Sequence, residues 1–210
     1  MTTRYYIESD GRIYLVSREG ALDLPVRDEI PFNIEEIGPL TSTQDVVFCV
    51  PELGRHPSEW MSKDAVPTDA AVTSLVREAV HASMPRVVAE GVHLQDGRLL
   101  LLKGARGLTK DRWTLPGGFV RFGEDPVTGL TREIREELGV SSTILELLSV
   151  RSKLGAHTRL HWTMFFYHVS LDGTILPNPD EIAEARYFVP QDGLRHLEDP
   201  VMRDVIGALL

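Results

Sequence analysis

Residues 115–140 read LPGGFVRFGEDPVTGLTREIREELGV, and this stretch contains a well-specified helix. Asp125 is a good N-cap residue, and Pro126 suits the first helical position because proline has no amide hydrogen to satisfy there. Gly139 is placed for the left-handed conformation that commonly follows a helix. The sequence therefore predicts a helix that begins at Pro126 and ends just before Gly139.

Two stripes run along this predicted helix. The apolar stripe, at about 100° per residue, consists of Val127, Leu130, Ile134 and Leu138. The second stripe is acidic and consists of Glu133, Glu136 and Glu137. Carboxylates at this spacing repel one another, so a compensating charge is expected. One reading is a solvated face with Arg or Lys partners. The other is a hard cation such as Mg²⁺, which binds carboxylate oxygens and keeps positions open for water and phosphate.

The same stretch resembles the Nudix box, which spans residues 118–140 here. The defined positions of the box are occupied by Gly118, Glu124, Arg132, Glu133, Ile134, Glu136, Glu137, Gly139 and Val140. The preceding Leu115-Pro116-Gly117 and the later residues 181–188 also look like the family, so the resemblance covers roughly residues 86–200. It implies an α/β fold, the Nudix α/β/α sandwich with a mixed β-sheet.

The resemblance also implies an activity, that of a Nudix hydrolase. Such an enzyme cleaves the diphosphate bond of a nucleoside diphosphate linked to another moiety, by attack of water on phosphorus, with Mg²⁺ or Mn²⁺. The physical chemistry agrees, because a diphosphate can enter a site rich in carboxylates only if metal ions bridge the two. The implied partner is therefore a small nucleotide-diphosphate substrate.

Carried over position by position, the family pattern assigns roles to individual residues. Glu136 and Glu137 are expected to be the main metal ligands, and Glu133 shares a metal or acts as general base. The carbonyl of Gly117 is a further candidate ligand. Arg132 is expected to orient a carboxylate of the box, either Glu124 or Glu133.

A loop residue completes the expected catalytic set. Family members often take one more acidic ligand or base from a loop after the central sheet, and Glu181 matches that place best. Asp180 and Glu184 are the alternatives. Lys103 and Arg112, with Arg106 and Lys110 nearby, are predicted to meet the substrate phosphates, the alternative being an exposed basic loop. Trp113 and Phe119 can pack on the sheet or stack on a base.

The sequence departs from the family pattern in ways that leave the substrate open. Gly129 and Leu130 occupy positions where the family often has alanines, and close packing is the expected reason for the glycine. The signatures of ADP-ribose, diadenosine polyphosphate and NADH enzymes downstream of the box are missing. A single cysteine, Cys49, also excludes the zinc ribbon that NADH enzymes usually carry.

Turn and cap signals outside the box organise the rest of the chain. Asp10-Gly11, Asp96-Gly97 and Asp172-Gly173 each predict a hairpin, because this dipeptide adopts the positive φ angles of tight turns. The second is expected to join the strand Val87 to Leu94 with Arg98 to Lys103. A further helix is predicted from a cap at Thr68 or Asp69 up to Pro85. We therefore expect a β-rich N-terminal extension with a linking helix over residues 1–84 and the hydrolase domain over residues 85–210.

Composition limits the binding partners and the cellular location that are expected for the protein. The 210 residues carry a net charge of -9, which argues against general electrostatic binding to nucleic acid or to an anionic membrane. No apolar run is long enough to span a bilayer. One cysteine permits no internal disulfide, so a cytoplasmic location is expected. The N-terminal extension is expected to shape a homodimer or to cover the substrate cleft.

Two other functions compete with hydrolysis. A non-catalytic Nudix-fold sensor or regulator would bind a nucleotide ligand without cleaving it, but such modules tend to lose box carboxylates, and this chain keeps them. Diphosphate isomerisation on a related fold needs a catalytic cysteine in the domain. Cys49 lies outside that domain, in the apolar run Val46 to Val50, which is predicted to be a buried strand.

Overall fold

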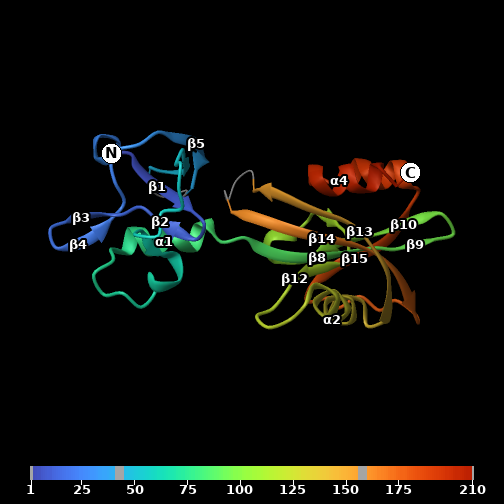
Figure 1. Cartoon of the computed structure of the whole chain (residues 1–210). Coiled ribbons are helices and arrows are strands. Elements are labelled where there is room, and N and C mark those ends of the chain that lie inside the picture. Colours follow the sequence, from blue (N-terminus) through green and yellow to red (C-terminus); the bar gives the residue numbers. More distant parts are fainter. Residues whose placement is uncertain (1, 41–44, 156–159, 210) are drawn as a thin grey trace. The chain divides into compact units, whose positions relative to one another are not determined.

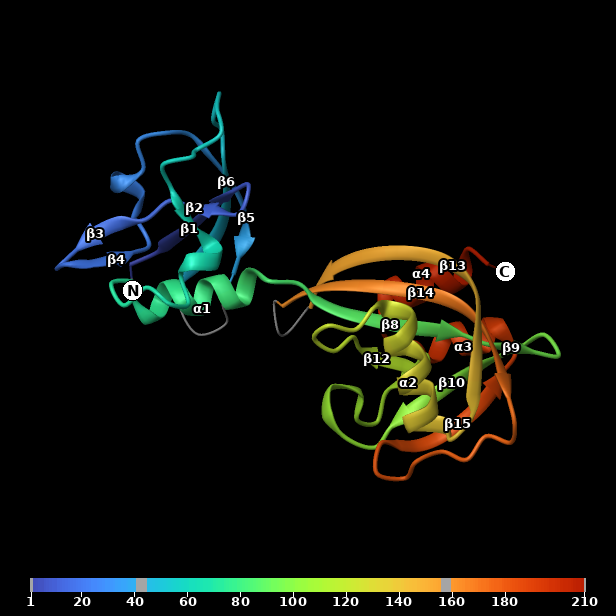
Figure 2. The same ribbon diagram turned by 60° about the horizontal axis from the view of Figure 1, so that its bottom comes forward.

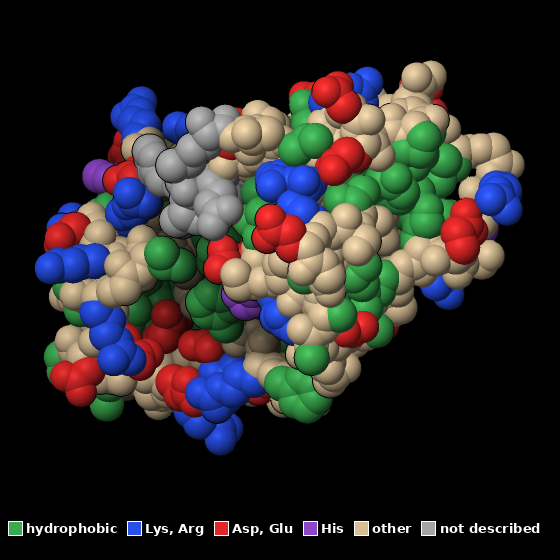
Figure 3. Space-filling model, turned by 90° about the vertical axis from the view of Figure 1, so that its left-hand side faces the viewer, with side chains coloured by type: hydrophobic (Ala, Val, Ile, Leu, Met, Phe, Trp, Pro, Cys, Tyr) green, Lys and Arg blue, Asp and Glu red, His purple; other side chains and the backbone are tan. Residues whose placement is uncertain are grey.

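The computed structural model describes residues 2–40, 45–155 and 160–209, and the chain divides into two compact units (Figure 1). Unit 1 comprises residues 1–85 together with 154–161, and unit 2 comprises residues 86–153 and 162–210. No helix in the described ranges combines the length and the apolar character needed to cross a membrane. Figure 3 shows acidic and basic side chains interspersed over the face in view, so the net negative charge does not form one uniform field there.

Unit 1 is a small β-rich unit with one α-helix. Its elements are β1 (Arg4–Ser9), β2 (Arg12–Ile13), β3 (Val16–Arg18), β4 (Ala21–Asp23), β5 (Ile34–Pro39), β6 (Val46–Pro51), β7 (Met61–Ser62) and α1 (Ser74–Ser83), with short 3₁₀ turns at Arg27–Glu29 and Lys63–Ala65. Five strands form a sheet in the order β5-β6-β1-β2-β7, and β3 pairs with β4. The unit has its own core, in which Tyr6, Ile13 and Val76 are fully buried. Cys49 lies buried on β6, in the strand that the apolar run predicted.

The predicted start of the helix in unit 1 is wrong. Helix α1 begins at Ser74 and is capped by Thr73, whose side-chain oxygen accepts from the amide of Val76. Thr68 and Asp69 form a turn instead, because the Asp69 carboxylate accepts from the Ala71 amide two residues on. An Asp side chain can cap a turn as well as a helix, so the cap signal alone did not fix the boundary.

Unit 2 contains the predicted hydrolase region. Its elements are β8 (Arg86–Val92), β9 (Leu94–Gln95), β10 (Arg98–Gly104), β11 (Trp113–Thr114), β12 (Gly117–Phe119), α2 (Pro126–Leu138), β13 (Ser141–Leu154), β14 (His161–Asp172), β15 (Ile182–Phe188), α3 (Pro190–His196) and α4 (Pro200–Gly207), with a 3₁₀ turn at Gly107–Thr109. One sheet has the order β12-β8-β14-β13, and a second has the order β11-β10-β15 with β9 paired to β10. Strands β8 and β14 run parallel, whereas β12 is antiparallel to β8, so the sheet is mixed.

Helices cover both faces of these strands. Helix α2 packs on β8 and β12 (Figure 2) over a core that includes Leu130, Ile134 and Leu100. Helices α3 and α4 cover a second core that includes Phe166, Leu101 and other side chains of the opposite strand faces. In Figure 1 α2 and α4 lie on opposite sides of the strands. The predicted α/β/α sandwich with a mixed sheet is confirmed.

Two of the three predicted hairpin turns are confirmed. Asp10 and Asp96 have φ of 50°, each is followed by a glycine at 70°, and each turn joins antiparallel partners. The strand predicted before the second turn, however, divides in two. Only the two-residue β9 pairs with β10, whereas β8 leaves to pair with β12 and β14.

The third Asp-Gly pair does not form a hairpin. Strand β14 ends at Asp172, and the next strand, β15, pairs with β10 rather than turning back on β14. The chain between them runs to the C-terminal end of α2, where the amide of Leu176 donates to the Leu138 carbonyl. Competition from these helix-end carbonyls, which have no partner within the helix, explains why the local turn signal failed.

The central helix α2 has the predicted boundaries. Asp125 accepts from the Thr128 amide at 2.9 Å, and Gly139 has a φ of 67°. One residue of the predicted apolar stripe is misplaced, since Val127 in the first turn is exposed and Gly129 is buried instead. A Cβ at position 129 would lie 3.1 Å from a Glu124 carboxylate oxygen, which supports the expectation that close packing selects this glycine.

Candidate active site

The candidate site forms where α2 meets the β12 strand. Gly117 begins β12, and its amide donates to the Glu137 carboxylate at 2.9 Å. Gly117 has a φ of 140°, and a Cβ there would lie 2.1 Å from the Ala89 carbonyl oxygen, so only glycine fits this close approach of β12 to β8. The predicted candidates Gly117 and Glu137 are therefore neighbours, although they are 20 residues apart in sequence.

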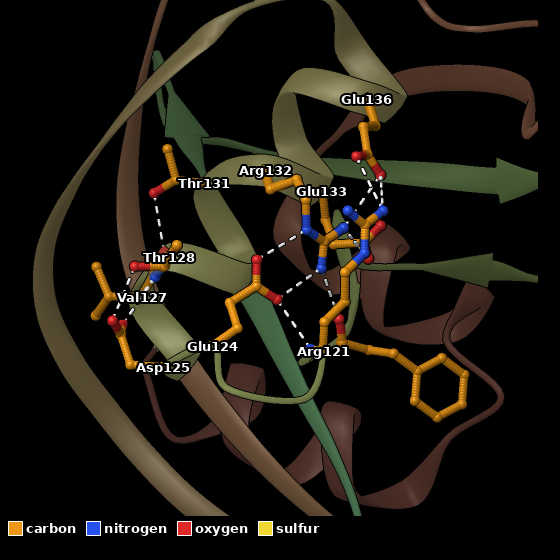
Figure 4. Close-up of polar contacts among 10 residues, drawn as sticks. Arg121, Glu124, Asp125, Val127, Thr128, Thr131, Arg132, Glu133 and Glu136 are labelled. Carbon is orange, nitrogen blue, oxygen red and sulfur yellow. Dashed lines mark hydrogen bonds and ion pairs between the residues drawn. The ribbon is translucent and has the colours of Figure 1, made fainter.

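Arg132 is the centre of a polar network along the helix (Figure 4). Its guanidinium donates to both oxygens of Glu124, each at 2.9 Å, and also to Glu133 at 2.7 Å. A further bond at 2.9 Å reaches the carbonyl of Phe119. This fork lowers the pKa of Glu124 to about 2, chiefly through the side-chain hydrogen bond to Arg132. Glu124 and Glu133, the two carboxylates considered as partners of Arg132, thus both accept hydrogen bonds from it.

Glu136 is held at the surface by two arginines. Arg121 donates to its oxygens at 3.1 and 3.2 Å, and Arg132 donates at 3.1 Å. The side chain of Glu136 is 39% exposed, compared with 16% for Glu133. Glu136 is therefore the most accessible carboxylate of the acidic stripe, and it has arginine partners of the kind expected for a solvated helix face.

Glu137 is in a different environment from Glu136. Burial raises the pKa of its carboxyl group to about 8, against the opposing hydrogen bond from Gly117, and the nearby carboxylates of Glu133 and Glu181 raise it further. A half-buried carboxyl group among other carboxylates is stabilised in its charged form when a cation binds. Such perturbation by burial together with specific charges is typical of functional sites.

Glu133 lies against the glycine that opens the box. A Cβ at Gly118 would come within 2.9 Å of the Glu133 carboxyl carbon and 3.1 Å of one of its oxygens. Any larger residue at position 118 would push this carboxylate away. The first defined glycine of the motif thus makes room for a carboxylate.

Glu181 belongs to the same acidic region. Its carboxylate forms an ion pair with Arg106, and its charge contributes to the raised pKa of Glu137. The hydrogen bond from the Asn178 amide to the Glu137 carbonyl holds the preceding loop at the end of α2. Of the alternatives, Asp180 is exposed, and Glu184 lies on β15 beside Arg186.

The predicted phosphate contacts Lys103 and Arg112 have neighbours of their own. Lys103 is on β10, paired with Trp113 in the neighbouring strand, and Arg112 forms an ion pair with Glu198 at 3.3 Å. Within the described residues, no hydrogen bond or ion pair connects Lys103 or Arg112 with the carboxylates of the box. The ring of Trp113 packs edge-on against the ring of Phe188, with 5.0 Å between the ring centres. Of the two roles considered for Trp113, this contact corresponds to packing and not to stacking on a base.

Phe119 is half-exposed at the end of β12. Its ring lies 5.5 Å from the ring of Trp162, and the side chain is 49% exposed. The exposed ring next to the box therefore leaves the stacking role open for Phe119.

One acidic residue of the region was not predicted. Glu90 is in the middle of β8, 5% exposed, directly opposite Gly117 in the strand register. The signal was present in the sequence as a single charged residue inside the apolar run Val87–Val92. Buried carboxylates are rare unless they are paired, so a charge at such a position is informative.

The donor set suits a hard divalent cation. All candidate ligands are oxygens, which Mg²⁺ and Mn²⁺ prefer, and one buried carboxylate oxygen, Oε2 of Glu90, has no hydrogen-bond partner in the described part of the chain. No three Asp, Glu, His or Cys side chains of the described ranges are already arranged to hold a metal ion. Arg121 and Arg132 hold Glu136, and Arg106 holds Glu181, so these carboxylates must exchange partners to bind a cation.

Comparisons with known proteins give a family match. The family model described as NUDIX domain matches residues 84–209. An ADP-ribose pyrophosphatase from Methanocaldococcus jannaschii is 33% identical over 104 residues, which cover 50% of this chain and 62% of that protein. The alignment thus spans less than two thirds of this relative.

Solved structures show the same fold. The crystal structure of a MutT NUDIX hydrolase from Burkholderia pseudomallei matches with a TM-score of 0.53 and 29% identity, over 61% of this chain and 100% of that chain. A crystal structure described as a UDP-X diphosphatase matches with a TM-score of 0.51 and 26% identity, over 60% of this chain and 63% of that chain.

Proposed function

The chain belongs to the Nudix family, and from this premise we propose that it is a Mg²⁺- or Mn²⁺-dependent hydrolase of a nucleoside diphosphate linked to another group. The observation that carries the proposal is Glu137, a half-buried carboxyl group fixed by the Gly117 amide and surrounded by the carboxylates of Glu133, Glu136 and Glu181. Two of the similar proteins, the ADP-ribose pyrophosphatase and the UDP-X diphosphatase, have names that denote substrates of this class.

In the proposed reaction, the oxygen of water forms a bond to one phosphorus atom of the diphosphate. The bond between that phosphorus and the bridging oxygen breaks, which releases a nucleoside monophosphate and the phosphorylated partner group. A bound divalent cation would neutralise the phosphate charge and favour deprotonation of water. Glu136, Glu137, Glu181 and the Gly117 carbonyl are the residues that would hold it.

The remaining residues of the site would orient other side chains or accept protons. Glu133 would share the cation or accept the proton of the attacking water, and its place beside Gly118 keeps it close to β12. Arg132 would fix the direction of Glu133 while its other donors hold Glu124 and the backbone of Phe119. We keep Lys103 and Arg112 as predicted phosphate contacts, to be tested by an increase of KM in Lys103→Met and Arg112→Met.

An activity screen tests this proposal. Purified full-length protein is incubated with Mg²⁺ or Mn²⁺ and a panel that includes ADP-ribose, UDP-glucose, a dinucleoside polyphosphate, a coenzyme A derivative and nucleoside triphosphates. In water labelled with ¹⁸O, we expect one phosphate product to gain a single ¹⁸O atom. Tight binding of a panel member without cleavage of any would instead support the sensor function.

We further propose that residues 85–210 form the hydrolase domain, that residues 1–84 are a separate extension, and that the protein acts in the cytoplasm as a homodimer. The location is supported by a single, buried cysteine.

The edge strand β13 supports the dimer, because it exposes Leu145, Leu147 and Val150, and exposed apolar edge strands favour pairing. Light scattering coupled to gel filtration should give twice the mass of one chain, and a monomer at all concentrations would reject the homodimer.

A further inference from the structure

Glu90 is a buried acid that the proposed reaction does not yet use. It lies in the centre of β8 with 5% of its surface exposed, and one of its two carboxylate oxygens, Oε2, has no hydrogen-bond partner among the described residues. Burying an unpaired carboxylate costs free energy that packing does not recover. A carboxylate retained at such a place therefore needs a partner that is present in the working protein.

The neighbours of Glu90 on one side belong to the candidate active site. Glu90 pairs with Gly117 in the register of β8 and β12, and a Cβ at Gly117 would lie 3.0 Å from the Glu90 Cα atom. The same Gly117 donates its amide to Glu137. Burial raises the pKa of Glu90 well above its usual value, and the carboxylates of Glu137 and Glu133 raise it further. Three carboxylates therefore share one partly buried region.

A lysine also acts on Glu90 electrostatically. Lys153 is near the end of β13, its charge lowers the pKa of Glu90, and its ammonium group forms an ion pair with Asp199. Asp199 is itself fixed, because its other oxygen caps α4 by accepting from the amides of Val201 and Met202. The ion pair of Lys153 is thus with Asp199, and the lysine does not fully compensate Glu90.

We propose that Glu90 is a further carboxylate ligand of the divalent cation that Glu137 would hold, and that Lys153, anchored on Asp199, positions it. This inference rests on the proposed function. It explains why the uncompensated oxygen is buried beside Gly117 and the acidic helix face and not exposed to solvent. It adds to the metal site a ligand from β8, a strand that lies outside the sequence motif.

Direct measurement of metal binding tests the role of Glu90. Mn²⁺ is titrated into the full-length protein and followed by the loss of the free-ion signal in electron paramagnetic resonance. Glu90→Gln keeps the shape and removes the charge, and we expect it to bind Mn²⁺ at least about tenfold more weakly than wild type, or to lose one bound ion. Glu146→Gln, an exposed carboxylate on β13, is the matched control and should bind like wild type. Equal Mn²⁺ affinity and stoichiometry in Glu90→Gln and wild type would overturn the proposal.

Two additions keep the test decisive. Glu90→Met, apolar and unbranched, covers the case in which a buried glutamine amide prevents folding, and it should show the same loss of Mn²⁺ binding. The Mn²⁺-induced rise in melting temperature should shrink in both variants. If wild-type protein binds Mn²⁺ through Glu90 but cleaves nothing in the substrate panel, the proposed function fails and the ligand assignment stands. If wild type cleaves a substrate and Glu90→Gln binds Mn²⁺ normally, only the ligand assignment fails.

Discussion

The burial of Glu137 predicts that the metal-free protein loses stability as pH rises. The carboxyl group has a pKa of 4.5 in the unfolded chain and about 8 in the folded protein. Between these values the folded state holds a proton that the unfolded state has released, so the free energy of unfolding falls with increasing pH. This contribution is fully present below pH 4.5 and is lost by about pH 8.

The magnitude follows from the distance between the two pKa values. They differ by about 3.5, and at ~1.4 kcal/mol per unit the full cost of ionising Glu137 is about 5 kcal/mol. Because the side chain is only half-buried, screening by solvent reduces this cost, and we expect about 2 kcal/mol to be measured.

Urea unfolding in EDTA, from pH 5 to pH 8, measures this loss. Glu137→Gln is the comparison, because its amide oxygen can still accept from Gly117 but cannot ionise. Wild type should lose about 2 kcal/mol more than the variant across this range, and saturating Mg²⁺ should restore wild-type stability at pH 8. Parallel pH profiles of wild type and Glu137→Gln would refute the reasoning that Glu137 is buried without a counter-charge.

Three further substitutions test separate parts of the site. Gly118→Ala should displace the Glu133 carboxylate and lower kcat by about a hundredfold with an unchanged melting temperature, and wild-type turnover would contradict this steric role. Arg121→Ala should remove one of the two arginine partners of Glu136 and lower the Mg²⁺ concentration for half-maximal activity about twofold; an unchanged or increased concentration would show that Arg121 does not compete with the cation. Asp125→Ala should lower the free energy of unfolding, measured in urea, by about 1 kcal/mol because the helix cap is lost. An unchanged urea midpoint would argue against a stabilising cap.

The sequence was most informative where local chemistry and the motif agree. Asp125, Pro126 and Gly139 marked the ends of α2 correctly, because caps act through the backbone of their own helix. Arg132 also donates to Glu124, one of the two carboxylates named as its candidate partners, and both residues belong to one short motif.

Long-range competition explains what the sequence did not reveal. Asp172-Gly173 has the signal of a hairpin, but the chain after it bonds to the end of α2, which no local pattern records. Helix α1 begins at Ser74 because the Asp69 carboxylate satisfies a turn first. Glu90 was hidden in an apolar run, and only the register of β8 with β12 places it beside Gly117.

Hydrolysis by a matched pair of variants tests the central claim most directly. Wild type, Glu137→Gln and the control Glu146→Gln are compared with Mg²⁺ on the best substrate of the panel, by release of the nucleoside monophosphate. We predict that Glu137→Gln loses at least about a hundredfold in kcat while remaining folded, and that the control keeps wild-type turnover. Wild-type turnover in Glu137→Gln would contradict the assignment of this carboxylate to the catalytic centre.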